Sequence, residues 1–316
     1  MDTQTLPYIT TDVFTSTRYE GNPLAIIRMP TSQPLEQDQK QKIAREFNFS
    51  ETVILHENEK SYEKLEWVFD IFLTTREIPF AGHPTIGTIV YLGKVLENSG
   101  ASGVINGTLL AKAGRLPFTY DTRSEVATAE VPNDSHVHQK VLDPQALRNL
   151  GVRSEVFDHM TGPAAVVSIV KGMTFGLTEL SSLSALGCVA PGYQELGTEG
   201  LDAEYALNGP CGLLFYHITE QNESVTKVRS RMILGAIEDP ATGSASSALG
   251  IWLALQSSRS RDAGKKVHRF EITQGVEMGR QSVIGVEITL DDKGTVVKVA
   301  LSGTAVEVMR GSLGVP

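Results

Sequence analysis

A short motif occurs twice in this chain, and each copy leads into a segment that is apolar on almost every side. The first copy, Glu77–Thr85, reads EIPFAGHPT, and the second, Glu238–Ser246, reads EDPATGSAS. The segments that follow, Ile86–Leu96 and Ser244–Gln256, carry apolar side chains around most of a helical circumference. Because such a helix must be covered by other elements, the sequence predicts two helices that are each surrounded by strands.

The order of the remaining segments indicates two similar halves. In each half several strand-like segments precede the motif, and more short strands follow the helix. Strict alternation of strands and helices is absent, so a doubly wound parallel sheet is not favoured. A polar interruption at 131–136 falls near mid-chain. We therefore predict an α+β protein with domains at 1–131 and 132–316, and with a C-terminal strand near 300–316 that could pack back onto the first domain.

Composition narrows the class of partner. The 316 residues carry 28 basic and 37 acidic side chains, a net charge of −9, which disfavours nucleic acid and anionic membranes as partners. No apolar run approaches the roughly 20 residues of a membrane span. The two cysteines, Cys188 and Cys211, are far apart and lack metal-like spacing. We expect a cytoplasmic protein without structural disulfides or zinc.

The glycine turns of the two motifs are candidate substrate-binding sites. Gly82 and Gly243 allow close approach to the start of a helix, where free N–H groups and the positive end of the dipole attract anions. Pro84 is expected at the first helical position, where a missing N–H costs nothing. One copy alone would be an ordinary helix start. Two copies at matched spacing favour a shared anion site, with Ser244 beside it.

Three ionisable residues are candidates for proton transfer. Glu51 begins an apolar strand-like segment, where burial could raise its pKa as a general acid or base requires. The local pattern alone favours an exposed residue at a strand end. Asp239 precedes Pro240 and could instead cap the following helix. His83 follows the first glycine turn and could carry a proton near neutral pH, although an isolated His is more often structural.

Seven stretches of the chain resemble the PhzF-like (phenazine biosynthesis-like) isomerases, which share the diaminopimelate epimerase fold. They are, in chain order, DVFT at 12–15, GNP at 21–23, SET at 50–52, PFAGHPTIG at 79–87, EDPATGSA at 238–245, QGVEMGR at 274–280 and LSGTA at 301–305. The resemblance spans almost the whole chain in the family's order. It implies two pseudo-symmetric domains, each with strands around a central helix, and an active site in the cleft between them.

The resemblance also implies an activity and roles for residues. Glu51 would be the main proton carrier, with His83, Asp239 and Ser244 around the substrate. Neither an organic cofactor nor a metal would be needed, and a homodimer would be expected. The reaction would be a proton shift on a small carboxylate-bearing substrate.

Two other functions stay open at the level of sequence. Epimerisation or racemisation at one carbon would place Glu51 and Asp239 on opposite faces of the substrate. A racemase with two opposed thiols is disfavoured, because neither glycine turn has a neighbouring Cys. A non-catalytic protein that binds a small molecule in the cleft is the remaining alternative.

Overall fold

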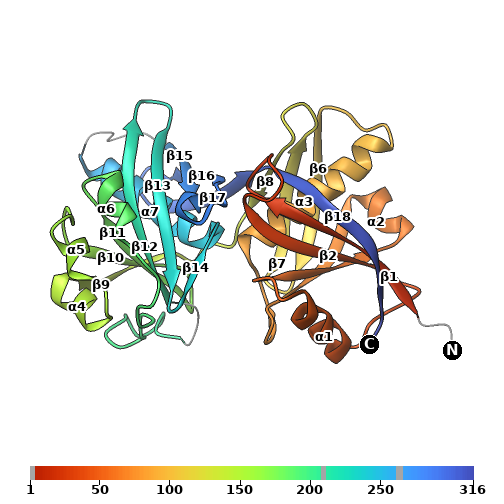
Figure 1. Ribbon diagram of the computed structural model, residues 1–316. Coiled ribbons are helices and arrows are strands. Elements are labelled where there is room, and N and C mark those ends of the chain that lie inside the picture. The colour runs from red at the N-terminus through yellow and green to blue at the C-terminus, as the bar shows by residue number, and fades with distance from the viewer. Residues whose placement is uncertain (1–3, 208–210, 261–265) are drawn as a thin grey trace. The chain divides into compact units, whose positions relative to one another are not determined.

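The chain forms two compact units. The computed structural model describes residues 4–207, 211–260 and 266–316. Unit 1 comprises Met1–Val131 and Ser302–Pro316, and unit 2 comprises Pro132–Leu301. Figure 1 shows the C-terminal strand β18 lying beside β1. The last fifteen residues therefore belong to the same unit as the first strand.

Within its described residues, unit 1 is built from strands with three helices among them. Its elements are β1 (Thr5–Val13), β2 (Asn22–Pro30), α1 (Gln37–Phe47), β3 (Thr52–Glu57), α2 (Glu59–Lys64), β4 (Glu66–Phe72), β5 (Glu77–Ile78), α3 (Gly82–Asn98), β6 (Val104–Ala111), β7 (Gly114–Asp121), β8 (Val126–Glu130) and β18 (Ala305–Gly314). Hydrogen bonding joins β18, β1, β2, β3, β4, β6, β7 and β8 in that order, and β5 pairs with β4. The β2–β3 and β4–β6 pairs are parallel, and the other pairs are antiparallel.

The central helix of unit 1 is α3. Every residue from Gly82 to Val90 is buried, and the helix contacts β1, β2, β3, β7, β8 and β18. At Gly87 an added Cβ would lie 2.6 Å from Leu24 and 2.8 Å from Val13, so a side chain would force these strands away. The opposite face of the sheet is covered by α1, whose Ile43 and Ala44 join a second core cluster with residues of β1–β4. Both faces of the strands are thereby buried.

Unit 2 repeats this plan. Its elements are β9 (His136–Leu142), α4 (Pro144–Asn149), α5 (Ser154–Phe157), β10 (Ala164–Val170), β11 (Met173–Glu179), α6 (Leu183–Gly187), β12 (Cys211–Gln221), β13 (Thr226–Leu234), β14 (Ile237–Asp239), α7 (Gly243–Ser260), β15 (Val267–Gln274), the 3-10 turn η1 (Val276–Met278), β16 (Ser282–Leu290) and β17 (Val296–Gly303). Hydrogen bonding joins β9, β10, β11, β12, β13, β15 and β16 in order, and β14 pairs with β13. The parallel pairs, β11–β12 and β13–β15, correspond to β2–β3 and β4–β6 of unit 1.

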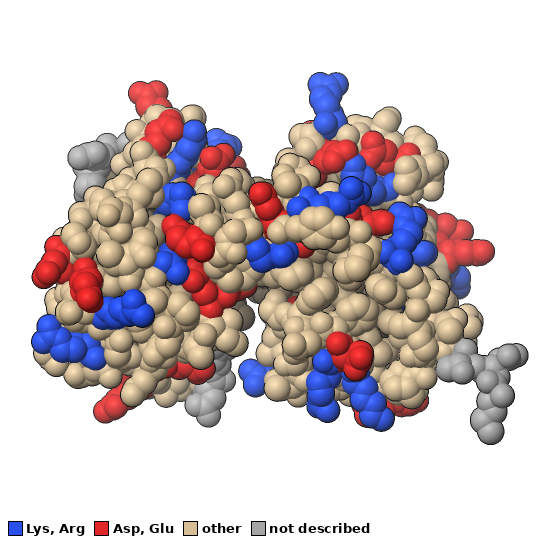
Figure 2. All heavy atoms as spheres, viewed as in Figure 1, with Lys and Arg blue, Asp and Glu red and all other residues tan. Residues whose placement is uncertain are grey.

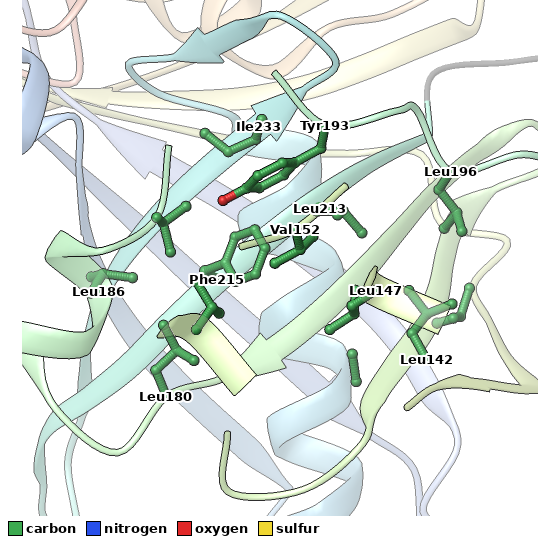
Figure 3. Close-up of a cluster of buried hydrophobic side chains, with 14 of the residues drawn as sticks. Leu142, Leu147, Val152, Leu180, Leu186, Tyr193, Leu196, Leu213, Phe215 and Ile233 are labelled. Atoms are coloured by element: carbon green, nitrogen blue, oxygen red, sulfur yellow. The ribbon is translucent and has the colours of Figure 1, made fainter. Parts of the chain in front are cut away.

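Two layers cover the sheet of unit 2. The central helix α7 contacts β10, β11, β15 and β16. On β12, alternate residues face opposite layers: Tyr216 hydrogen-bonds Trp252 of α7, whereas Leu213 and Phe215 join a separate cluster. Figure 3 shows this cluster, in which side chains from β9, β12, β13 and the α4–α6 region pack together. The alternation is the period of two expected for a strand buried on both sides.

The predicted helices are present and are longer than expected. The first helix, expected to begin at Pro84 and to end at Leu96, spans Gly82–Asn98 as α3, and the second, expected to end at Gln256, extends to Ser260 in α7. Pro84 is the third helical residue rather than the first, because α3 begins at Gly82. Its missing N–H remains harmless there, since the first turn of a helix has no intrahelical acceptors for its amides.

Charged side chains are scattered over the surface, as they are along the sequence. Figure 2 shows acidic and basic side chains interspersed on the viewed face of both units. Among the described residues, none of the helices combines the length and apolar character that a membrane span requires.

Candidate active-site residues

Glu51 and His83 meet in unit 1, although 31 residues separate them in the sequence. Glu51 immediately precedes β3, and His83 is the second residue of α3. Strand pairing explains their meeting, because Thr52 pairs with Phe72 and Phe72 pairs with Glu77, which returns the chain to the start of β3 just before α3 begins. Oε2 of Glu51 lies 3.6 Å from Nδ1 of His83. This is slightly longer than a hydrogen bond.

The carboxyl group of Glu51 is in a poorly solvated place. Its side chain is 16% exposed, and that of His83 is 4% exposed. Burial raises the pKa of Glu51, and a hydrogen bond from Ser50 partly opposes this shift. Burial acts in this direction because it penalises the charged form of the acid. Glu51 is therefore not the exposed strand-end residue that the local sequence pattern favours.

Two residues beside Glu51 are not among the candidates taken from sequence. The hydroxyl of Ser50, which hydrogen-bonds Glu51, also lies 3.5 Å from Oδ1 of Asn22, and its single hydrogen can go to one of the two. Asn22 is 1% exposed and is the first residue of β2. Both lie in the GNP and SET stretches that carry the family resemblance, so the signal was present in the sequence. Their polar character alone could not reveal that they lie beside Glu51.

Asp239 lies at the end of β14 in unit 2, and Thr242 and Gln274 are among the residues that hold it. Its Oδ2 accepts a hydrogen bond of 2.5 Å from the hydroxyl of Thr242. Its backbone oxygen accepts one of 2.7 Å from Nε2 of Gln274, the last residue of β15. Neither Thr242 nor Gln274 was predicted as a site residue, although Gln274 opens the QGVEMGR stretch.

The two glycine turns place their helices in the same way. Gly82 is the first residue of α3 and follows the N-cap Ala81. In unit 2, Gly243 begins α7, and the N–H of Ser246 donates to the carbonyl of Thr242 at 2.9 Å, as expected for an N-cap residue. His83 and the half-buried Ser244 therefore hold equivalent second positions in the two helices.

Gly82 and Gly243 are not among the described glycines with positive φ. A left-handed backbone is therefore not the reason for glycine at these two positions. What each glycine supplies is a helix start with no side chain over its first amide groups. Such a start can receive an anionic group closely.

One group of residues in unit 2 has the composition of a metal site. Within the described residues, His136, His138 and Asp202 place potential ligand atoms within 4.8 Å of one another. Nδ1 of His138 accepts the backbone N–H of Asp202 at 3.1 Å, and Nε2 donates to Ser168 at 2.9 Å. Nε2 of His136 lies 2.6 Å from Oδ2 of Asp202. Because the lone pair of His138 is already engaged, this group is a hydrogen-bonded network rather than a preformed metal centre.

Two cavities in the structure lie away from the candidate residues. One of about 420 Å³ is lined by residues 133–137 and 294–296 with Ile251 and Leu255. The other, of about 370 Å³, lies in unit 1 against Tyr91, Lys94 and the start of β18. Neither is lined by Glu51 or Asp239.

Comparison with known proteins gives a consistent result along the whole chain. A family model described as "Phenazine biosynthesis-like protein" matches residues 11–311. An uncharacterized isomerase from Mesorhizobium japonicum is 31% identical, with 98% of this chain and 99% of the relative covered. The trans-2,3-dihydro-3-hydroxyanthranilate isomerase of Pseudomonas chlororaphis is 28% identical, with 97% and 98% covered.

Solved structures resemble the fold. A PhzF-family phenazine biosynthesis protein from Bacillus anthracis gives a TM-score of 0.77 at 20% identity, covering 98% of this chain and 99% of the other. A hydroxyproline epimerase from Agrobacterium vitis gives 0.59 at 13% identity, covering 98% and 92%. The predicted epimerase-like α+β fold is confirmed by these structures.

Proposed function

Because the chain belongs to the phenazine biosynthesis-like protein family, we propose that it is a cofactor-independent isomerase that moves a proton on a small carboxylate-bearing substrate, with Glu51 as the proton carrier. Relatives across the full length are named isomerases, and the chain is an enzyme of that class. The observation that carries the proposed mechanism is the largely buried Glu51, whose pKa is raised by burial and whose carboxylate lies 3.6 Å from His83 at the start of α3.

The proposed reaction uses Glu51 first as a base and then as an acid. Its carboxylate takes a proton from a carbon that is activated by a conjugated carbonyl or imine. The electron pair of the broken C–H bond moves into the conjugated system, and the new carboxylic acid returns the proton at another carbon. A raised pKa suits both steps, because the carboxylate is more basic and its acid persists closer to neutral pH.

The surroundings of Glu51 have supporting roles in this proposal. Negative charge develops on the substrate when the proton leaves. The positive end of the α3 dipole can stabilise that charge, and preorganised dipoles in a poorly solvated site act strongly. His83 is close enough to Glu51 to relay or orient its proton. Positioned acid–base catalysis contributes typically ~10²–10⁴-fold to the rate.

A conversion assay in heavy water tests the proposal. The first probe is trans-2,3-dihydro-3-hydroxyanthranilate, because a full-length relative is named for it; other unsaturated or cyclic amino and hydroxy acids follow. We expect the wild-type protein to form an isomer, and Glu51→Gln to lower the rate by about 10²–10⁴-fold. NMR would detect the isomer and the position of any deuterium. Glu66→Gln is the control, because Glu66 lies in β4 and pairs with Arg115.

Three results would count against the proposal. Full activity of Glu51→Gln would exclude Glu51 as the proton carrier. A ligand that binds and is recovered unchanged, with no conversion of any probe, would favour the non-catalytic binding function. A product that differs from its substrate only in the configuration of one carbon would assign epimerisation instead.

A further inference from the structure

We propose that Gln274 is a positioning residue for Asp239 and acts on its carboxylate through Thr242. The inference rests on the proposed function and adds to it Asp239, one of the three candidates for proton transfer taken from the sequence. Gln274 is completely buried at the end of β15, 35 residues after Asp239 in the sequence. A buried amide requires partners for its hydrogen-bonding groups, and here those partners are the Asp239–Thr242 turn.

The hydrogen bonds define which way the amide of Gln274 points. The backbone carbonyl of Asp239 can only accept, so the atom 2.7 Å from it is Nε2. The backbone N–H of Thr242 can only donate, so the atom 3.3 Å from it is Oε1. Nε2 also lies 3.1 Å from the hydroxyl of Thr242. Both ends of the amide are therefore fixed by groups whose donor or acceptor character is unambiguous.

These bonds form a chain with one direction. Nε2 of Gln274 donates to the hydroxyl of Thr242, and this hydroxyl donates its single hydrogen to Oδ2 of Asp239 at 2.5 Å. Hydrogen bonds in such a chain strengthen one another. Gln274 therefore fixes the orientation of the Thr242 hydroxyl, and that hydroxyl fixes the carboxylate of Asp239.

Unit 1 shows that the turn itself does not need this network. The equivalent turn, Ile78–Ala81, is held by the backbone N–H of Ala113, which donates to the carbonyl of Pro79 at 3.1 Å. Ala81 stands where unit 2 has Thr242, and Ile78 stands where unit 2 has Asp239. The side-chain network is therefore present in the copy with the carboxylate and unnecessary in the copy without it. This difference ties the network to Asp239 rather than to the fold.

The backbone after Gln274 is shaped to approach the turn. Gly275 has a φ of +76°, and a Cβ there would lie 2.4 Å from the carbonyl oxygen of Arg280 and 2.7 Å from that of Pro240. Any side chain would push the end of β15 away from the Asp239 turn. Glu238 immediately precedes Asp239 and forms a buried ion pair with Arg231 on the neighbouring strand β13. This ion pair also holds the turn in place.

Crystal structures of variants test the inference without any knowledge of the substrate. In Gln274→Met and in Thr242→Val we expect the Asp239 carboxylate to take a different rotamer or to become poorly ordered, while α7 and β15 stay in place. Thr242→Ser keeps the hydroxyl and should leave Asp239 as it is. An unchanged Asp239 in both Gln274→Met and Thr242→Val would overturn the inference, whether or not an activity is known.

A kinetic cycle then tests the coupling to chemistry. Gln274→Met should lower kcat by about 10–100-fold with little change in KM, the scale expected for a misplaced catalytic group. In an Asp239→Asn background the same substitution should cost less than about threefold, because residues that act through one group are not additive. Full additivity of the two losses would overturn the positioning role.

The control separates a loss of function from a loss of stability. Thr174→Val removes another fully buried hydroxyl of unit 2, one that is hydrogen-bonded to Ser168 at 2.7 Å and takes no part in the proposed site. It should lower the melting temperature without lowering kcat. If Asp239→Asn itself keeps full activity, the proposed role of Asp239 fails, whereas the structural effect of Gln274 on Asp239 is still decided by the crystal structures.

Discussion

The two units share a backbone plan and differ in chemistry. In both, a parallel strand pair is followed by an antiparallel strand, a short β-strand, a glycine turn and a buried helix. Thr52 pairs with Phe72, which pairs with the motif residue Glu77, and Leu213 pairs with Ile233, which pairs with the motif residue Glu238. The residue before Thr52 is Glu51 in unit 1, and the residue before Leu213 is Gly212 in unit 2. Glycine has no side chain that could carry a proton.

The short strand before each helix shows the reverse asymmetry. Unit 2 carries Asp239 with its Thr242 and Gln274 partners, and unit 1 has the apolar Ile78 in that place. Each unit therefore carries one of the two carboxylates, Glu51 in unit 1 and Asp239 in unit 2, and these lie at different positions of the shared backbone plan. The difference indicates that the frame supplies helix starts and turns, whereas single residues within it supply the two carboxylates.

The largest expected effect compares the two carboxylates directly. Glu51→Gln should reduce the isomerisation rate by about 10²–10⁴-fold, as loss of the proton carrier requires. Asp239→Asn should cost less, about 10²-fold, because we assign it a supporting role. Both rates would be measured on the same substrate at saturating concentration. Equal losses, with a product inverted at one carbon, would contradict a single proton carrier and favour a two-base epimerase.

The next effect compares Glu77 and Glu238, which open the two motifs. Glu238 pairs with Arg231, and both side chains are 8% exposed. Glu77 pairs with Lys112, whose side chain is 63% exposed. Glu238→Gln should destabilise unit 2 by about 3–5 kcal/mol, because it leaves a buried charge without its partner. Glu77→Gln should cost about 0–1 kcal/mol, as surface ion pairs do.

Calorimetry of both variants would measure this second difference. Tryptophan fluorescence adds a local readout, because Trp67 lies in unit 1 and Trp252 in unit 2. Similar losses in the two variants would show that the ion pairs of the two motifs stabilise their units equally, which would contradict the expected difference.

The smallest expected effect is on the pH dependence of stability, to which Glu51 contributes through its raised pKa. Burial raises its pKa in the folded protein above the ordinary 4.5, so the folded state holds this proton more tightly than the unfolded state does. The favourable contribution of this proton to the free energy of unfolding is complete below pH 4.5. It is lost as the pH rises through the pKa that Glu51 has in the folded state. Glu51→Gln should therefore melt higher than the wild type near pH 8, by a few degrees at about 2–4 °C per kcal/mol.

The difference should shrink as the pH falls toward 4.5. Asp70→Asn is a control of opposite sign. Burial opposes ionisation of Asp70, but hydrogen bonds from His56 and Lys40 outweigh it and lower its pKa. This variant should melt lower than the wild type at neutral pH, with the gap closing in acid. A pH-independent difference for Glu51→Gln would show that burial does not perturb this carboxyl.

Local sequence was informative where structure depends on neighbouring residues. The two helices, their glycine starts and the alternation of Trp67, Phe69 and Ile71 follow from short-range patterns, and those three side chains are at most 1% exposed. Local sequence was misleading for Glu51, since nothing in residues 49–55 distinguishes an exposed strand end from a buried one. It also placed Pro84 two positions too early in the helix.

The sequence by itself determined the repeated frame, the apolar central helices and, through the family resemblance, which residues deserve testing as acids and bases. Only the tertiary structure brought Glu51 within 3.6 Å of His83 and placed the buried amide of Gln274 on the Asp239 turn. The physical reason is that both contacts depend on strand pairing between distant segments. Pairing fixes where each side chain lies and how well water reaches it, and short-range patterns contain neither.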